Sequence, residues 1–131
     1  MKKQILVNNK WLKVIRETVR FPDGTFIKDF YAVERPTYAA VVPLLDNGKI
    51  VLVRQYRHGS RRTILNLPMG SFAKKEKPIQ AAKRELLEET GYTTKHISYL
   101  GAFENNPAFL RLTAHIFLAQ NLKKEIDYKT D

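Results

Sequence analysis

Cysteine is absent from the 131 residues, so the chain holds neither a disulfide nor a thiolate metal site. Long apolar runs are also lacking, and nothing approaches the roughly 18 residues that a membrane helix needs. The apolar stretch near the start ends after Ile5, Leu6 and Val7, which is too short for the core of a signal peptide. We therefore expect a cytoplasmic protein without a membrane partner.

Acidic residues are scarce, with 13 Asp and Glu against 23 Lys and Arg and a net charge of +10 at pH 7. This excess fits an anionic small substrate or nucleic acid, or only solvated lysines on strand edges. No basic stretch alternates with aromatic residues as in an RNA-binding sheet, so nucleic acid is the least favoured partner. The hydrophobic content of 44% is that of a folded domain with a sizeable core.

Strand and turn signals fill most of the chain outside one helix. Turn residues at 21–25 and at Asp46-Asn47-Gly48 predict two hairpins between neighbouring strands. The predicted strands are, in chain order, 11–20, 26–33, 39–45, 50–57, 97–103 and 113–119. We therefore predict a single α+β domain over residues 1–131, with antiparallel strands at its N-terminal end.

One helix is predicted, from about Pro78 to Thr90. Proline stands in its first turn and Gly91 just past its end, which are the expected start and stop signals. At about 100° per residue, Ile79, Ala82 and Leu86 share one apolar stripe. The spacing therefore describes an amphipathic helix with a defined apolar side.

The neighbouring arc of this helix carries Glu85, Glu88 and Glu89. Carboxylates at these spacings repel one another and cost helix stability unless cations compensate. Hard divalent ions such as Mg²⁺ take oxygen ligands of this kind, and diphosphate cleavage uses such ions to neutralise phosphate charge and activate water. An acidic helix face is also commonly only solvated surface, so spacing alone leaves both interpretations open.

The stretch from Gly70 to Tyr92 matches the pattern G-x5-E-x7-R-E-U-x-E-E-x-G-U, in which U is a bulky apolar residue. Every fixed letter is present, and the one soft departure is the aromatic Tyr92. The stretch resembles the Nudix box. The chain is therefore similar to the Nudix pyrophosphohydrolases, which cut the diphosphate bridge of a nucleoside diphosphate linked to another moiety. This resemblance implies an αβα sandwich with a mixed sheet.

The resemblance implies a metal site on the helix. Glu85 and Glu89 would be the principal ligands of Mg²⁺, with Mn²⁺ as the alternative ion. Glu88 would support them or bind a further ion, and the main-chain carbonyl of Met69 would complete the site.

The same resemblance gives Arg84 a catalytic role, in which it orients the glutamates by ion pairing, while Glu76 braces the loop before the helix. The histidines His58, His96 and His115 show no ligand spacing, and no serine–histidine set suggests a nucleophilic triad. Direct attack by water is therefore the expected chemistry.

Outside the box, the chain resembles the ADP-ribose pyrophosphatase branch. The segments 52–57 and 65–70 resemble strand and loop signatures of that branch, and Pro107 falls 15 residues after the box, where that branch has a proline. The front strands, about 1–36, are similar to strands that the branch exchanges between subunits. The resemblance implies a homodimer that converts ADP-ribose to AMP and ribose 5-phosphate.

Five substrate-binding residues follow from this branch. Trp11 and Phe30 fall where the family stacks aromatics on adenine, which is a sequence-tolerant way to hold a base. Arg35 and Arg57 fall on arginines that contact the nucleotide and its phosphates, which suit a guanidinium. Pro107 borders the substrate. Trp11 and Phe30 could instead serve only to pack the core of the dimer.

Departures from the branch concern the rest of the site. Asn66 replaces a glutamate, and 110–112 replaces a Ser-x-Glu segment. A loop with a further catalytic glutamate would lie where the sequence stops, so we expect the C-terminal part of the fold to be missing. Glu125, Asp127 and Asp131 are the candidates for that base.

Other functions stay open at this point. Rival substrates are GDP-sugars, NAD-like dinucleotides and a capped RNA 5′ end. A nucleotide-binding Nudix module without turnover is the alternative outside the enzymes. Such modules typically lose box glutamates, and this chain keeps all of them, which favours the enzyme.

Overall fold

The computed structural model describes residues 2–128, which form two compact units. Of the described residues, the N-terminal unit comprises 2–37 and 104–113, and the helix unit comprises 38–103 and 114–128. The prediction of one domain over the whole chain stays a prediction.

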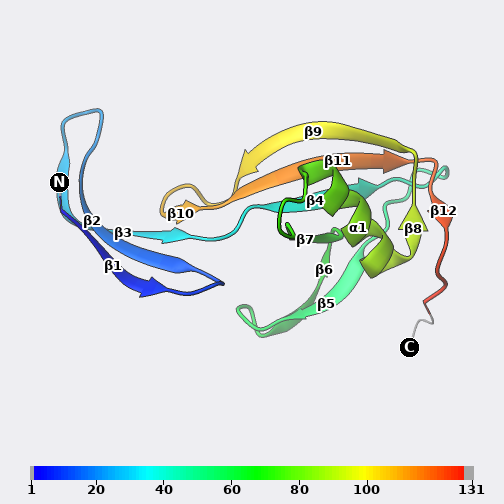
Figure 1. The fold of residues 1–131 in the computed structure, drawn as a ribbon, viewed down its shortest axis with the longest axis horizontal. Coiled ribbons are helices and arrows are strands. Elements are labelled where there is room, and N and C mark those ends of the chain that lie inside the picture. The colour runs from blue at the N-terminus through cyan, green and yellow to red at the C-terminus, as the bar shows by residue number, and fades with distance from the viewer. Residues whose placement is uncertain (1, 129–131) are drawn as a thin grey trace. The chain divides into compact units, whose positions relative to one another are not determined.

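The N-terminal unit is a four-stranded sheet in the order β1-β2-β3-β10 (Figure 1). Its strands are β1 (Lys3–Asn8), β2 (Lys13–Arg20), β3 (Phe26–Glu34) and β10 (Leu110–Arg111). The first three run antiparallel, as predicted, and β10 joins β3 in parallel. Ile15 and Ala32 are opposite each other on β2 and β3 and are fully buried. The apolar side of this sheet is therefore centred on the β2–β3 pair.

The strand β1 was not among the predicted strands. Its apolar residues Ile5, Leu6 and Val7 are consecutive, so they lack the period-two alternation that marks a half-buried strand. Pairing with β2 makes it a strand, and every residue of it is exposed. It forms an edge of the sheet with apolar side chains in contact with solvent.

The helix unit contains a mixed sheet in the order β7-β4-β11-β9 (Figure 1). Its strands are β4 (Tyr38–Pro43), β7 (Met69–Ser71), β9 (His96–Glu104) and β11 (Thr113–Gln120). β4 runs parallel to β11 and antiparallel to β7. Two further pairs are β5 (Val53–Arg57) with β6 (Arg62–Asn66), and β8 (Tyr92–Thr93) with β12 (Lys123–Lys124).

The hairpin predicted across Asp46-Asn47-Gly48 forms only at its turn. Gly48 adopts φ = 81° and donates its N–H to the carbonyl of Leu45 at 2.9 Å. Beyond the turn, pairing stops at the Leu44–Ile50 bridge and the hydrogen bond from the N–H of Val51 to the carbonyl of Pro43 at 3.0 Å. The strand that was predicted over 50–57 begins at Val53 and pairs with β6. The prediction fails there because β4 already has β7 on one edge and β11 on the other.

The helix α1 spans Pro78–Thr90, with the predicted bounds. At its start, the side-chain carbonyl of Gln80 accepts the N–H of Lys77 at 2.9 Å. At its end, Gly91 adopts φ = 76° and donates its N–H to the carbonyl of Leu87. A β-carbon at Gly91 would lie 2.0 Å from the carbonyl oxygen of Ile126, so both conformation and space require glycine there.

The core of the helix unit lies between α1 and the mixed sheet. Alanines contribute much of it, and small side chains let the helix backbone approach the strands closely. The fully or almost fully buried members are Ala39, Val41, Ala81, Ala82, Leu86, Phe117 and Ala119. Ile79 was predicted on the apolar stripe, but it is 39% exposed, because it lies in the first turn beyond this contact, and Ala81 is buried instead.

The α+β class and the mixed sheet are confirmed by these elements. Within residues 2–128, α1 is the one helix, so a helical layer on a second sheet face is not part of the described chain. At 13 residues, α1 is too short to cross a membrane, and no other described segment is a candidate for a spanning helix.

Candidate functional site

Gly70 and Glu85 are in direct contact in the helix unit. Strand β7 pairs with β4 and carries Gly70 beneath α1, where Glu85 is only 9% exposed. A β-carbon on Gly70 would lie 2.0 Å from Oε1 of Glu85, so only glycine leaves room for this carboxylate. Burial raises the pKa of Glu85, and the neighbouring carboxylates act in the same direction, while Arg84 opposes them. The sequence therefore places a partly desolvated carboxylate directly over the backbone of β7 at Gly70.

Arg84 is the hub of the acidic cluster. Its Nη1 donates to Oε1 of Glu85 at 2.6 Å and to Oε2 of Glu88 at 3.2 Å. Its Nε and Nη2 donate to the two oxygens of Glu76 at 2.8 and 2.9 Å, and Nη2 also reaches the carbonyl of Ser71 at 3.0 Å. One guanidinium thus fixes two helix carboxylates and the preceding loop. These are the contacts expected of an orienting arginine, whose catalytic role stays a prediction.

Glu76 is held at both of its oxygens by Arg84, and Oε1 also accepts the N–H of Ala73 at 3.0 Å. Hydrogen bonds from Arg84, and then the one from Ala73, lower the pKa of Glu76 to about 2. The loop before α1 is therefore closed by an ionised carboxylate over the whole physiological pH range.

Glu89 has different partners. Its Oε2 accepts the backbone N–H of Met69 at 3.0 Å, and its Oε1 accepts Nε2 of Gln55 at 3.1 Å. The Oε1 of Gln55 in turn accepts Nη2 of Arg57 at 2.6 Å. The predicted substrate-binding Arg57 is thereby connected to a predicted metal ligand. Gln55 was not assigned a role from sequence, although its i, i+2 spacing from Arg57 along a strand places both on one face.

The donor chemistry of this cluster fits a hard divalent cation, which takes carboxylate and carbonyl oxygens. Within residues 2–128, no three acidic or histidine side chains converge as they would around a bound ion. The reason is visible in the contacts: Arg84 neutralises Glu85 and Glu88, and Met69 and Gln55 satisfy Glu89. Ion binding therefore requires these carboxylates to exchange hydrogen bonds for coordination.

The other predicted substrate residues belong to the N-terminal unit. Trp11 is 63% exposed in the turn between β1 and β2, with Nζ of Lys10 4.5 Å from its ring. The ring of Phe30 packs edge-on against Phe21 at 6.1 Å. Arg35 lines a shallow hollow of about 310 Å³ beside the turn that carries Trp11. Pro107 lies in an exposed turn. Arg35 and the turn that carries Trp11 are therefore near one another. The ring of Phe30 instead packs against another aromatic ring of the same unit.

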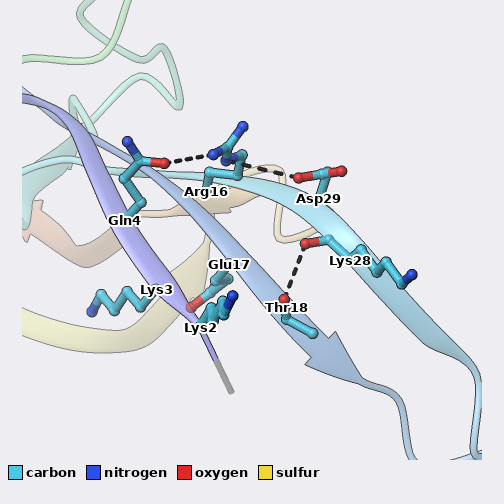
Figure 2. Close-up of a pocket in the computed structure, with 8 residues that line it drawn as sticks. All are labelled: Lys2, Lys3, Gln4, Arg16, Glu17, Thr18, Lys28 and Asp29. Atoms are coloured by element: carbon cyan, nitrogen blue, oxygen red, sulfur yellow. Dashed lines mark hydrogen bonds and ion pairs between the residues drawn. The ribbon is translucent and has the colours of Figure 1, made fainter.

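A second hollow of about 320 Å³ lies on the N-terminal unit, and none of the predicted site residues lines it (Figure 2). Arg16 crosses it, donating to Gln4 at 2.6 Å and pairing with Asp29 at 3.7 Å. The lining lysines are Lys2, Lys3 and Lys28. Exposed ion pairs of this type contribute little stability. The lysines and the arginine of this hollow are therefore the part of the net positive charge that we interpret as solvated surface.

The departures from the branch pattern have distinct environments. Nδ2 of Asn66 is buried and has no hydrogen-bond partner among the described residues. Arg111 in β10 is ion-paired with Glu17 and, at 3.1 Å, with Glu34, so it fastens β10 to the N-terminal sheet. Of the candidate bases, Glu125 is within 3.2 Å of Lys123, Asp127 is exposed, and Asp131 lies outside the described residues.

Comparisons with known proteins agree with this architecture. The model of the NUDIX domain matches residues 34–127. The ADP-ribose pyrophosphatase of Bacillus subtilis is 38% identical over 95% of this chain and 70% of its own length. The methanol dehydrogenase activator of Bacillus methanolicus is 32% identical over 95% of this chain and 67% of its own. The crystal structure of an ADP compounds hydrolase superposes with a TM-score of 0.81 and 22% identity, covering 100% of this chain and 71% of that one.

A mixed sheet, one helix with a carboxylate cluster, and the Gly70 strand beneath it define the class of an α+β phosphoanhydride hydrolase. The chain belongs to the NUDIX family, and its assignment to the Nudix pyrophosphohydrolases is confirmed. Within that family it resembles the ADP-ribose pyrophosphatase branch.

Proposed function

We propose that this protein hydrolyses the diphosphate bridge of ADP-ribose, giving AMP and ribose 5-phosphate, with Mg²⁺ as the metal and Mn²⁺ as its alternative. Water adds to one phosphorus atom and the bridging P–O bond breaks, so the two phosphate products account for every atom. The arrangement that carries the proposal is the network in which Arg84 and Gln55 hold Glu85, Glu88 and Glu89 beside the Met69–Gly70 backbone.

Glu85 and Glu89 would hold the ion, with Glu88 and the carbonyl of Met69 as further oxygen ligands. When bound, the ion supplies charge neutralisation at the diphosphate and a more acidic water. Arg84 keeps two of the carboxylates aligned on the helix, because its Nη1 binds both Glu85 and Glu88. Gln55 does the same for Glu89 through the hydrogen bond from its side-chain amide.

We assign the adenosine diphosphate half of the substrate on the branch resemblance, residue by residue. Arg57, linked through Gln55 to Glu89, is the arginine that supports phosphate binding beside the carboxylates. Trp11 offers an exposed indole for stacking, and Arg35 lines the hollow next to its turn. Phe30 and Pro107 complete the proposed set. A cytoplasmic location stays a prediction.

Hydrolysis rates with ADP-ribose, ADP-glucose, GDP-mannose, NAD and a capped RNA test the proposal, each measured with and without Mg²⁺. We expect ADP-ribose to give the highest kcat/KM, and Glu89→Gln to lower kcat by several orders of magnitude while leaving the thermal unfolding temperature near that of wild type. Preference for GDP-mannose would overturn the adenine assignment. Binding without turnover of any compound would favour the non-catalytic module.

We also propose a two-fold homodimer through the N-terminal unit. All residues of β1 are exposed, and this strand is an edge of the sheet within the described residues, with Ile5, Leu6 and Val7 in solvent. Such an edge is a template for pairing with another chain, and closed two-fold assemblies are the commonest oligomers.

A further inference from the structure

The helix α1 carries its acidic residues near its C-terminal end, where they oppose the helix dipole. The carboxylates of Glu85, Glu88 and Glu89 all lie in its last two turns, where the helix dipole is negative. The first turn has no acidic residue and the last turn no basic one. Mutual repulsion of the glutamates adds to the cost. Arg84 pairs with Glu85 and Glu88 from within the helix, so the remaining cost lies at the last turn. There a positive charge and hydrogen-bond donors come from elsewhere in the chain.

Lys124 supplies the charge. It lies in β12, which pairs antiparallel with β8 directly after the helix, so that Lys124 stands opposite Tyr92. Its Nζ donates to the carbonyl of Thr90, the last helical residue, at 3.1 Å, and lies 4.4 Å from the centre of the Tyr92 ring. An ammonium group at this point compensates the negative end of the helix dipole, and the Tyr92 ring stabilises it there.

Tyr128 and the intervening backbone satisfy further carbonyls at the same end. The hydroxyl of Tyr128 donates to the carbonyl of Glu88 at 2.9 Å. The N–H groups of Glu125 and Ile126 donate to the carbonyl of Gly91 at 2.8 and 3.1 Å. Unpaired carbonyls at a helix end are normally left to water or to capping residues. Here a segment over 30 residues along the chain provides the partners.

We infer that Lys124 and Tyr128 are positioning residues that hold the last turn of α1, and with it Glu88 and Glu89, in the geometry that the proposed reaction needs. The inference rests on the proposed function for its catalytic consequence. Loss of either contact would let the last turn fray, which would move the carboxylates relative to Met69 and Gln55 without removing any metal ligand or substrate contact.

The test compares Lys124→Met and Tyr128→Phe with Lys123→Met as the matched control. Lys123 is the adjacent lysine of the same strand, and its ammonium pairs only with the exposed Glu125 among the described residues. Four quantities are measured: amide hydrogen exchange at residues 88–91 by NMR, Mn²⁺ affinity without nucleotide by electron paramagnetic resonance, and kcat and KM for ADP-ribose.

In both variants, the exchange rates of these amides and the dissociation constant for Mn²⁺ should rise roughly three- to tenfold above wild type. This is the size expected for the loss of a charge–dipole contact or a hydrogen bond. The value of kcat should fall while KM for ADP-ribose stays within about twofold. Lys124→Arg should restore amide exchange, Mn²⁺ affinity and kcat, and Lys123→Met should match wild type.

Exchange rates or Mn²⁺ affinity in Lys124→Met that equal those of Lys123→Met would overturn the inference. Its failure can be told apart from failure of the proposed function. If the wild type hydrolyses no diphosphate, the proposed function is wrong, whereas the exchange and Mn²⁺ comparisons still decide whether the two residues position the helix end.

Discussion

The side-chain amide of Gln55 donates to Oε1 of Glu89 across a Nε2–Oε1 distance of 3.1 Å, and its own carbonyl accepts Arg57. One uncharged side chain thereby joins the β5–β6 hairpin to the carboxylate cluster of α1. The amide must keep this orientation, because its nitrogen faces a carboxylate and its oxygen faces a guanidinium.

Replacing Gln55 with methionine, which has a similar shape, should lower kcat/KM by about tenfold or more, because hydrogen bonds to charged groups are worth about 1.5–3 kcal/mol. Gln55→Glu should be worse, since it places a second carboxylate against Glu89. Steady-state kinetics measure both. Gln120→Met, at the exposed end of β11, is the control. Equal kcat/KM for Gln55→Met and the control would show that the contact has no part in turnover.

Gly70→Ala should displace the carboxylate of Glu85, because the added carbon would lie 2.0 Å from Oε1. We expect the free energy of unfolding to fall by about 1–3 kcal/mol, as for other overpacked sites, and kcat to fall by at least tenfold. Urea unfolding and kinetics measure the two effects. Gly59→Ala is the matched control, since a carbon at Gly59 meets nothing within 4 Å. Wild-type activity in Gly70→Ala would contradict the placement of Glu85 in the site.

The ion pair between Glu76 and Arg84 should make the free energy of unfolding depend on pH. Its pKa is about 2 in the folded protein, because Arg84 and then Ala73 donate to it, against an ordinary value of 4.5. A lowered pKa gives stability that is present in full above the unfolded value and is lost as pH falls towards the folded value. The unfolding free energy of wild type should therefore exceed that of Glu76→Gln most at pH 6, and the difference should shrink from about pH 5 downwards. A difference that is constant from pH 6 to pH 3 would exclude this pairing.

Trp11→Ala should raise KM for ADP-ribose by about tenfold or more and leave kcat largely unchanged, because stacking on a base is worth roughly 1–3 kcal/mol. Trp11→Phe, which keeps a stacking face, should recover most of the loss. Similar kcat/KM values for ADP-ribose and ADP-glucose in the wild type would mean that the adenosine half is read and the sugar is not. An unchanged KM in Trp11→Ala would exclude a role for the indole in binding adenine.

The homodimer can be tested at its exposed edge. Sedimentation at micromolar concentration should give twice the mass of one chain, and Leu6→Lys on β1 should shift the protein towards monomer because it places a charge on the apolar edge. Lys3→Glu on the same strand is a control for a change of charge outside the apolar residues. A monomeric wild type with full activity would contradict both the dimer and any site shared between subunits.

Local signals in the sequence determined the helix and the identity of its acidic face. Pro78 and Gly91 act through backbone geometry within one turn, so they specify the ends of α1 without help from the rest of the fold. The fixed spacing from Gly70 through Glu89 likewise identified the Nudix box, and with it the family, before any contact was known. The turn at 21–25 was readable for the same local reason.

Tertiary structure decided which distant groups meet. Gln55 contacts Glu89 across 34 residues of sequence, and Lys124 contacts Thr90 from β12. No local sequence pattern predicts that β12 pairs with β8. The strand after Gly48 pairs with β6 because both edges of β4 are already occupied, and β1 is a strand only because β2 is beside it. Periodicity reports which side of a segment is apolar, but hydrogen-bond partners and strand neighbours depend on competition between segments for the same edge or carbonyl.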